Sequence, residues 1–460
     1  MAGDVPRRRC RPCGAPHRGV QPVMHKTVRE WGHVRLDQGG LTRAQGDALL
    51  AEARAHPLAH DEATNILIDR RDRLVARQMV GMVAAKGCSL EILPKVDPDE
   101  PDSKDVAAVR HRLVRMLDVA LGLKLDLGRS AAIDRQKHTL LEILIRAFAD
   151  KLLAEVRRGL PRQYLHCEDD LPALRGRLDV IRQFTRNAVR PDRLACRFDQ
   201  LDVDTPLMRI MAAAVIYLGR FTRSLDTRHK LDELRFTLAD IPQVPVNRLP
   251  WKQVRIDRTN RRWESLFRLA RLLLQRDWQA THHSARAPEG LTLLFPMNDL
   301  FEKYIAALLR KALTNSGVEV VDQGGHRACL GAYTGQHLHS GDVFRTKPDI
   351  ILRRDDDILA IIDTKWKKLS RNPLDPKHGV SQSDVYQLMA YARLYPTREL
   401  MLLYPELPGH HAIERPPFGI AGGAERLAIA TVDTSCTEDQ VIAQLKQLCG
   451  HFGITAQAGP

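Results

Sequence analysis

The pattern of apolar and polar residues changes several times along the chain, and each change predicts a different kind of structure. Residues 1–25 are rich in Pro, Arg and Gly, a composition typical of a flexible basic tail. Over residues 26–100, short strand-like runs are separated by glycines; they are TNILID, QMVGMVAA and SLEILPKVD. These runs predict a β-rich N-terminal domain. The acidic segment DPDEPDSKD that follows is typical of a linker.

Helical spacing dominates residues 101–285. In VAAVRHRLVRMLDVAL and HTLLEILIRAFADKLLAEVRRGL, apolar residues recur at intervals of three and four, which predicts amphipathic core helices. We expect further helices at 207–218 and 262–278, with turn-rich sequence before the first of them. This part of the chain is therefore predicted to be mainly helical.

The last part of the chain, residues 286–460, mixes the two periodicities. FPMNDLFEKYIAALLRKAL predicts an amphipathic helix with Asn298 as its N-cap. Strands, a hairpin within 346–369, a helix at 381–394 and the strand ELMLLYP follow. This order predicts an α/β domain with a mixed central sheet flanked by helices, and an α/β class for the whole protein.

Composition and charge narrow the classes of function. A chain of 460 residues with 44% hydrophobic residues has room for two or three domains with proper cores. The longest apolar run is too short to span a bilayer, so we expect no membrane association and a cytoplasmic location. A net charge of +14 favours a polyanionic partner such as nucleic acid, and an arginine-rich solvated surface is the alternative.

The eight cysteines are scattered and do not indicate a disulfide framework. Cys10 and Cys13 form a lone CxxC pair followed by His17, without a second pair at zinc-ribbon spacing. A basic tail is the better interpretation of that segment than a metal site.

The stretch TKPDIILRRDDDILAIIDTKWKKL is the strongest candidate for chemistry. Its acidic turn closes a hairpin that can bring Asp349 close to Asp363. Asp363 and Lys365 project to the same side of their strand because side chains alternate faces. Two carboxylates could hold Mg²⁺, and Lys365 could position or deprotonate a water and stabilise the transition state of phosphodiester hydrolysis.

The alternative for this stretch is a surface hairpin with solvated acidic ends. The apolar run ILAIID argues against it, because a strand buried on both faces does not normally end in Asp-x-Lys unless that end meets a site. The same spacing at Asp375 and Lys377 lies in a loop without a preceding strand and carries no such implication.

Three further residues could complete the site. Glu302, in the first turn of its helix, could supply another metal or water ligand, or could simply interact favourably with the helix N-terminus. Gln387 and Tyr391 are four residues apart and share a helix face. They could bind a DNA phosphate or brace the active site, and an ordinary amphipathic helix edge is the alternative.

The combination of these residues resembles the PD-(D/E)xK nuclease superfamily, with the Gln and Tyr pattern of its RecB-like branch. Asp363 replaces the commoner Glu, which that superfamily tolerates. From about residue 26 onward the chain also resembles the McrC family, the nuclease subunits of McrBC modification-dependent, 5-methylcytosine-specific restriction systems. Three ordered landmarks carry this resemblance: VGMVAAKGCSLEILPKV, GLPRQYLHCEDDLPALRGRLDV and CRFDQLDVDTPLMRI. Met208 departs from the family pattern, which usually has Asn there.

The resemblance implies a division of labour between two proteins. Residues 26–285 would dock onto the ring of an McrB-like AAA+ GTPase hexamer, enter its pore and stimulate GTP hydrolysis. The partner would recognise and translocate methylated double-stranded DNA, which residues 286–460 would cut with Mg²⁺ in phage defence. The chain has no GxxxxGK(S/T) phosphate loop, so GTP would be bound by the partner.

Arg175 and Arg177 are the upstream residues that could reach the partner's pore or a nucleotide interface. The alternative is a structural turn at Gly176 in which both arginines pair with Asp169 and Asp170. Asp199 and Asp204 are interpreted as caps or ion-pair partners. Two other functions stay open at this point: a non-catalytic activator or scaffold of the AAA+ ring, and a stand-alone RecB-like DNA repair nuclease.

Overall fold

A computed structural model describes residues 24–37, 39–56, 66–85, 87–96, 105–125, 138–275, 291–330, 343–370, 375–377, 379–406 and 414–454. The predicted basic tail, including Cys10 and Cys13, lies outside these ranges except for its last two residues, which begin strand β1. None of the helices in the described ranges has both the length and the apolar character needed to cross a membrane.

The N-terminal region is built on a four-stranded sheet in the order β1-β6-β5-β10. Its strands are β1 (Met24–Arg29), β5 (Met79–Ala85), β6 (Cys88–Leu93) and β10 (Leu291–Pro296). β1 runs parallel to β6, whereas β5 is antiparallel to both β6 and β10. Gly81 has a φ of +130°, and a Cβ there would lie 2.0 Å from the Leu293 carbonyl oxygen, so only glycine lets β10 approach.

A small sheet and one helix complete this region. The sheet has the order β2-β4-β3, from β2 (His33–Arg35), β3 (Leu67–Arg70) and β4 (Arg73–Ala76). Helix α1 (Arg43–Arg54) begins at a capping box formed by Thr42 and Gln45. The predicted domain boundary at residue 286 falls just before β10, so that boundary separates β10 from the sheet that it completes.

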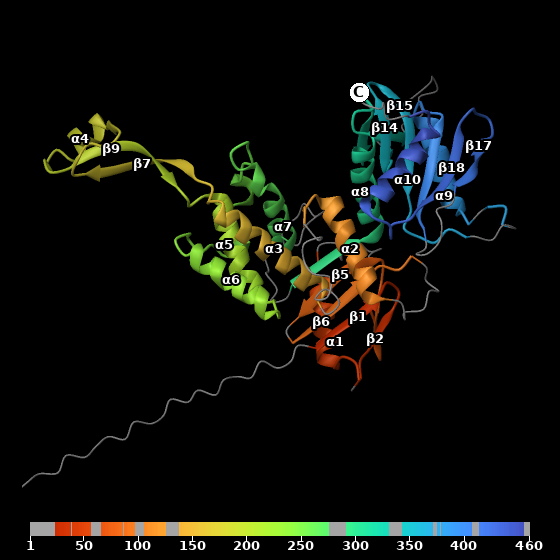
Figure 1. The fold of residues 1–460 in the computed structure, drawn as a ribbon, viewed down its shortest axis with the longest axis horizontal. Coiled ribbons are helices and arrows are strands. Elements are labelled where there is room, and N and C mark those ends of the chain that lie inside the picture. The colour runs from red at the N-terminus through yellow and green to blue at the C-terminus, as the bar shows by residue number, and fades with distance from the viewer. Residues whose placement is uncertain are drawn as a thin grey trace, which may run out of the picture.

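The middle of the chain is a group of helices packed on one core (Figure 1). The helices are α2 (Val106–Leu121), α3 (Leu140–Arg157), α5 (Pro206–Leu218), α6 (Leu225–Thr237) and α7 (Glu264–Gln275). Asp105, Thr139, Thr205 and Ser224 cap the first four through their side chains. The apolar spacing of their sequences fits the single buried core that they share.

A β-hairpin arm projects from these helices at the left of Figure 1. Its elements are β7 (Gln163–Leu171), β8 (Arg177–Leu178), α4 (Val180–Thr185) and β9 (Leu194–Asp202), with the sheet order β7-β9-β8. We use "arm" below for residues 163–202. The sequence predicts turn-rich segments here and no strands, because polar and apolar residues do not alternate along β7. The structure gives the reason for this missing pattern: both faces of β7 are mostly exposed.

The C-terminal region contains a six-stranded sheet in the order β11-β14-β15-β16-β18-β17. Its strands are β11 (Glu319–Asp322), β14 (Ile350–Arg354), β15 (Asp357–Thr364), β16 (Glu399–Pro405), β17 (Glu414–Gly419) and β18 (Arg426–Val432). The three central strands are parallel and the outer ones antiparallel, which confirms the predicted α/β class with a mixed sheet.

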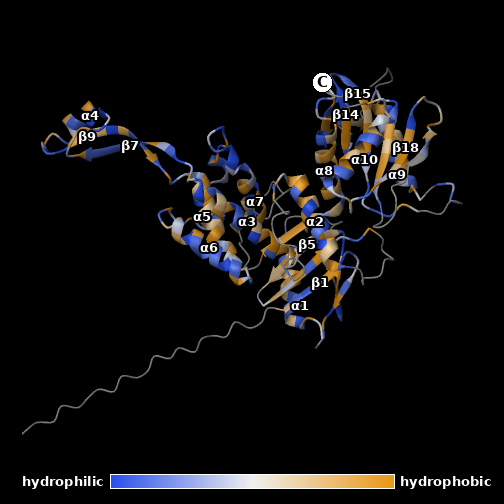
Figure 2. Ribbon diagram, in the orientation of Figure 1, coloured by the Kyte–Doolittle hydropathy of each residue, from blue (hydrophilic) through white to orange (hydrophobic). Residues whose placement is uncertain are grey.

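Helices cover both faces of this sheet. Helices α8 (Met297–Ala312) and α10 (Glu438–Gly450) pack on one face, and α9 (Gln382–Leu394) packs on the other. Figure 2 shows the apolar strands β14, β15 and β18 between them. A two-stranded sheet of β12 (Arg327–Leu330) and β13 (Val343–Thr346) lies beside α9. Pro296, rather than the predicted Asn298, is the N-cap of α8, because the helix begins two residues earlier than expected.

Candidate active site

The β14–β15 hairpin brings the two predicted acidic residues together. Ile350 pairs with Ile362, so the preceding Asp349 lies beside the end of β15, where Asp363 stands. The Asp349 Oδ2 atom accepts hydrogen bonds from the Thr364 backbone N–H at 2.8 Å and from its hydroxyl at 2.9 Å. The acidic turn that closes the hairpin places Asp355 at a φ of +53°. The side chain of Asp349 is thus fixed across the end of the neighbouring strand.

Lys365 connects Asp363 to helix α9. Its ammonium forms an ion pair with the fully buried Asp363 carboxylate and donates a hydrogen bond to Gln387 Oε1 at 3.2 Å. The Gln387 amide donates to the Tyr391 hydroxyl at 2.8 Å, and that hydroxyl donates to the Lys347 carbonyl at 3.1 Å. The structure therefore brings four of the predicted residues into one chain of polar contacts, in which Gln387 and Tyr391 hold Lys365 in place.

Burial and mutual repulsion shift the pKa values of this cluster. Burial, followed by the charge of Asp349, raises the pKa of Asp363 to about 7. Burial also raises the pKa of Asp349, although hydrogen bonds from Thr364 oppose the shift. Burial acts to lower the pKa of Lys365, but the nearby carboxylates, with Asp363 first, outweigh burial and raise it. Lys365 consequently remains an ammonium at neutral pH.

Glu302 reaches the same cluster from helix α8. The side chain is buried, its Oε2 accepts a hydrogen bond from Gln323 at 3.2 Å, and its Oε1 has no hydrogen-bond partner among the described residues. Burial and the neighbouring Asp349 raise the pKa of Glu302 to about 8. A solvated carboxylate near a helix N-terminus would not show these properties, so the structure favours a role for Glu302 in the site.

The donor set fits a magnesium ion held mainly by two carboxylates. Within the described residues, no group of three or more His, Cys, Asp or Glu side chains is close enough to enclose a metal alone. Magnesium usually takes one or two carboxylates and fills its other positions with water and phosphate oxygens. Asp363 Oδ1 is buried without a hydrogen-bond partner and is available as a ligand, and Asp349 lies beside it. Glu302 lies near Asp349 but, within the described residues, does not complete a group of three side chains that could enclose an ion.

The two arginines predicted to reach a partner lie at the turn between β7 and β8 in the arm. The Arg175 guanidinium stacks over the Phe198 ring at 4.2 Å and donates to Gln200 Oε1 at 3.5 Å. No side-chain partner of Arg177 is found among the described residues. Within the described residues neither arginine pairs with Asp169 or Asp170, and the Asp170 carboxylate binds Arg182 and Asn187 instead. The turn part of that alternative fits the structure, because Gly176 has a φ of +70°.

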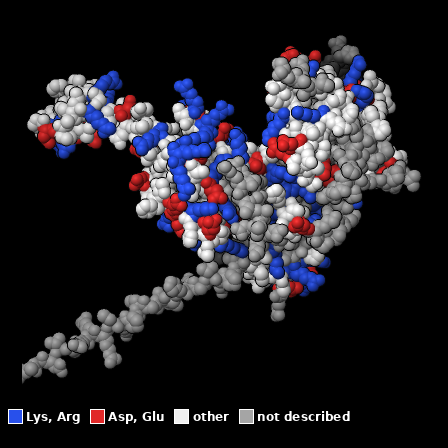
Figure 3. Space-filling model, viewed as in Figure 1, with Lys and Arg blue, Asp and Glu red and all other residues white. Residues whose placement is uncertain are grey.

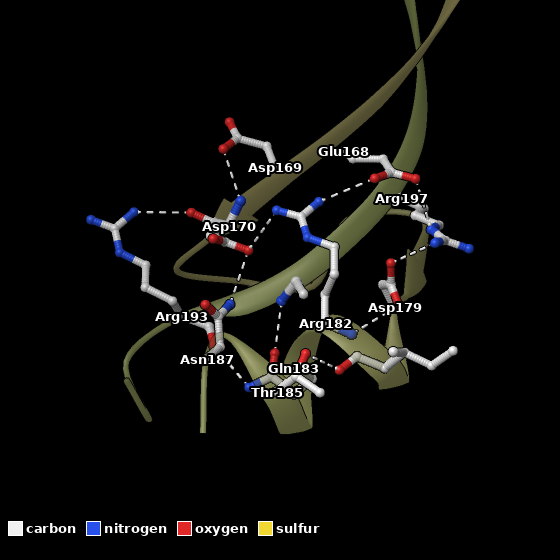
Figure 4. Close-up of polar contacts among 12 residues, drawn as sticks. Glu168, Asp169, Asp170, Asp179, Arg182, Gln183, Thr185, Asn187, Arg193 and Arg197 are labelled. Carbon is white, nitrogen blue, oxygen red and sulfur yellow. Dashed lines mark hydrogen bonds and ion pairs between the residues drawn. The ribbon is translucent and has the colours of Figure 1, made fainter. Parts of the chain in front are cut away.

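A polar network stiffens the tip of the arm (Figure 4). The Asp170 carboxylate accepts hydrogen bonds from Arg182 at 3.2 Å and from Asn187 at 2.9 Å. The Asp179 side chain caps helix α4 at the Arg182 N–H and pairs with Arg197 at 2.6 Å. These contacts join α4 to both long strands. Elsewhere in the region, Asp199 pairs with His166 and Asp204 with Arg209, which agrees with the structural roles expected for both.

The arm exposes apolar side chains that its sequence did not single out. Exposed large apolar residues gather on α4 and the adjoining strands; they are Tyr164, Leu165, Leu174, Leu178, Val180, Ile181, Phe184, Val189 and Leu201. Figure 3 shows basic residues spread over the helices at the base of the arm. An exposed apolar surface of this extent on a projecting element is typical of a protein-binding site.

Comparisons with known proteins place these features in context. The model of a family described as McrBC 5-methylcytosine restriction system component matches residues 74–405. One similar solved structure is a refined half-complex from the tetradecameric assembly of Thermococcus gammatolerans McrB AAA+ hexamers with bound McrC. The match has a TM-score of 0.66 and 22% sequence identity, and it covers 92% of this chain and 100% of that chain. A second is the Thermococcus gammatolerans McrBC complex, with a TM-score of 0.52 and 26% identity over 63% of this chain and 88% of that chain. No curated protein matches the chain.

Proposed function

We propose that this chain is the DNA-cutting subunit of a two-protein restriction system. The model of the McrBC 5-methylcytosine restriction system component family covers most of the chain, so the chain belongs to that family. In this proposal it is a Mg²⁺-dependent endonuclease that acts together with a GTP-hydrolysing AAA+ partner on methylated double-stranded DNA. The observation that carries the proposal is the cluster at the end of the β14–β15 hairpin, where the half-buried Asp349 and Lys365 flank the buried Asp363.

Each residue of the cluster has a distinct part in phosphodiester hydrolysis. Asp349 and Asp363 would hold Mg²⁺, which would polarise the phosphate and lower the pKa of a nearby water. Lys365, kept protonated by its neighbouring carboxylates, donates hydrogen bonds to phosphate oxygens as negative charge develops on them. A water that gives up one proton to solvent would bond through its oxygen to phosphorus, the bond from phosphorus to one deoxyribose oxygen would break, and that oxygen would take up a proton. Gln387 and Tyr391 keep the ammonium aimed at the reacting phosphate.

The arm is the proposed docking element for the partner. In the similar solved structure, McrC is bound to McrB AAA+ hexamers. A narrow element with exposed apolar side chains and a stiffened tip suits insertion into a ring, and Arg175 and Arg177 at its turn could contact the partner or its nucleotide. Since the sequence lacks a phosphate loop of its own, GTP is assigned to the partner.

The first prediction tests the active site in the complete complex with partner, GTP, Mg²⁺ and methylated duplex DNA. Asp363→Asn and Lys365→Ala should each lower the rate of DNA cleavage by at least about a hundredfold, because the first removes a proposed metal ligand and the second removes the positive charge that stabilises the transition state. The stimulated GTP hydrolysis should be unchanged, since the arm is untouched. Lys377→Ala, at the exposed loop copy of the Asp-x-Lys spacing, is the matched control and should cut normally.

Three other results would point elsewhere. Full cleavage by either active-site variant would remove the proposed catalytic cluster. Stimulated GTP hydrolysis without cleavage by the wild-type chain would favour the activator or scaffold. Cleavage by the isolated chain, without partner or GTP, would favour a stand-alone nuclease.

A further inference from the structure

A cavity of about 350 Å³ lies between the N-terminal sheet and the catalytic edge of the C-terminal sheet. Three separate parts of the chain line it. The N-terminal region contributes Trp31, Gln78 and Lys95, the start of α8 contributes Asn298, and the segment after β15 contributes Lys365 and Trp366. Since Lys365 also pairs with Asp363, the cavity opens directly beside the proposed catalytic cluster.

The topology explains why the cavity forms at this place. β1 and β6 are parallel, so their carboxyl ends meet at one edge of the N-terminal sheet, and β10 ends at the same edge. From there the chain continues directly into α8, which packs on the catalytic sheet. The Trp366 backbone N–H donates to Asn298 Oδ1 at 3.1 Å and fixes the start of α8 to the segment that follows β15. The edge of one sheet thus faces the catalytic end of the other.

Trp31 has a left-handed backbone conformation, which is strained for a bulky side chain. It has a φ of +66°, a region that bulky residues rarely adopt, and its side chain is 42% exposed. Its N–H donates to the Ala76 carbonyl at 3.1 Å, which fixes the turn. The Arg77 guanidinium lies 5.3 Å from the centre of its ring. A strained backbone position that carries a partly exposed aromatic side chain is typical of a ligand-binding position.

We propose that this cavity receives one nucleotide of the strand that is cut, next to the scissile phosphate. The proposal rests on the proposed nuclease function and makes the N-terminal sheet part of the substrate site. The base stacks on Trp31, and Lys95 faces the adjoining phosphate. Aromatic stacking platforms combined with basic side chains are how proteins bind unstacked nucleotides, and the volume lies within the range of small-ligand pockets. The nucleotide must therefore leave the duplex stack before cleavage.

The test uses the complete complex with partner, GTP, Mg²⁺ and methylated duplexes whose cut positions have been mapped. Single abasic sites are placed at successive positions around the cut, so that each duplex lacks one base. For the wild-type chain, kcat/KM should fall about tenfold at one position, where the base that stacks on Trp31 is missing. On intact DNA, kcat/KM of Trp31→Ala should be lower than that of the wild type by a similar factor. An abasic site at the same position should cause no further fall in kcat/KM of this variant.

Two controls separate stacking from general damage. Trp31→Phe keeps an aromatic face and should retain most of the abasic sensitivity. Phe236→Ala removes a side chain that is 84% exposed on α6, away from the cavity, and should behave as wild type. Stimulated GTP hydrolysis reports for every variant that the chain is folded and docked.

The outcomes distinguish this proposal from the proposed function. If the wild type cuts and Asp363→Asn does not, but Trp31→Ala keeps full abasic sensitivity, the nucleotide site is wrong and the nuclease stands. Wild-type cleavage that is insensitive to abasic sites at every position also overturns the nucleotide site, even if Trp31→Ala fails to fold. If the wild type does not cut, or Asp363→Asn cuts equally well, both proposals fall.

Discussion

Asp363 and Glu302 each hold a carboxyl oxygen that has no hydrogen-bond partner among the described residues, in surroundings that disfavour charge. A buried carboxyl oxygen without a hydrogen-bond partner is costly, so such atoms are found where a cation or a proton can neutralise them. Burial and the nearby Asp349 carboxyl raise the pKa of Asp363 to about 7 and that of Glu302 to about 8. The surroundings of these two residues support the cation site that we propose.

Glu30, beside the interdomain cavity, provides a prediction on stability and pH. Burial raises its pKa from 4.5 to about 7, although a hydrogen bond from the Lys95 N–H at 3.0 Å opposes the shift. Since the folded state holds this proton more tightly, its contribution to stability is complete below pH 4.5 and is lost as the pH rises through about 7. Relative to wild type, Glu30→Gln should gain up to about 3 kcal/mol at pH 8.5 and nothing near pH 4.5.

The measurement is urea unfolding of both proteins across that pH range. Asp72→Asn, at a carboxylate that is 76% exposed, should show no pH-dependent gain. An equal difference between Glu30→Gln and wild type at all pH values would show that Glu30 does not titrate in this way.

How well individual residues could be predicted depends on how local their signal is. Asp349, Asp363 and Lys365 lie on one hairpin, so strand alternation and a single turn suffice to bring them together. Gln387 and Tyr391 needed only helical spacing. Trp31 gave no signal, because its positive φ and its place in the cavity depend on contacts with Ala76 and with a sheet edge formed by distant strands.

At the scale of elements, the arm shows how a short helix can be stable through tertiary contacts. Helix α4 has six residues, too few to be stable alone, and its side chains are mostly exposed. Its stability comes from the Asp179 cap and from the contacts of Arg182 with Asp170 and Glu168. In the sequence these polar residues are typical of a loop, because their stabilising contacts are tertiary. The sequence pattern therefore predicts the core helices but not the strands of the arm.

The arm leads to a prediction for partner binding. Asp170→Ala removes the acceptor shared by Arg182 and Asn187, so α4 should loosen while the rest of the chain stays folded. Amide hydrogen exchange should become faster in α4 alone. The concentration of the chain needed to stimulate GTP hydrolysis by the partner should rise about tenfold, for a loss of roughly 1–2 kcal/mol.

Asp192→Ala is the matched control, because this side chain is 74% exposed and lies in the same part of the arm. It should leave both exchange and stimulation unchanged. Faster exchange in α4 with normal stimulation would mean that the arm does not carry the docking surface.

At the scale of the whole molecule, one buried ion pair joins the N-terminal sheet to the helices. Glu91 in β6 is fully buried and receives two hydrogen bonds from Arg110 of α2, at 2.8 and 2.6 Å. It also accepts from the Leu140 N–H at the start of α3 at 2.8 Å. Because α2 packs in turn against α8, the sheet, the helices and the catalytic region are mechanically connected.

Breaking this pair on one side should be costly. Arg110→Met leaves the Glu91 charge buried without its cation and should lower the free energy of unfolding by about 3–5 kcal/mol. The measurement is the thermal midpoint of the chain. Arg157→Met, which removes an exposed ion pair with Glu233, should cost at most about 1 kcal/mol. If both substitutions lower the free energy of unfolding by the same amount, the buried ion pair contributes no more to stability than an exposed one.

Strand β10 has a practical consequence for anyone who wishes to study the catalytic half alone. A fragment cut at residue 286 would carry away a strand whose hydrogen-bonding partner, β5, stays behind. In the C-terminal fragment, β10 would expose Leu291, Leu293 and Phe295 to water. In the N-terminal fragment, β5 would become an edge strand with unpaired backbone N–H and C=O groups. Both halves would be prone to aggregate, so expression trials should keep the polypeptide whole or supply the two pieces together.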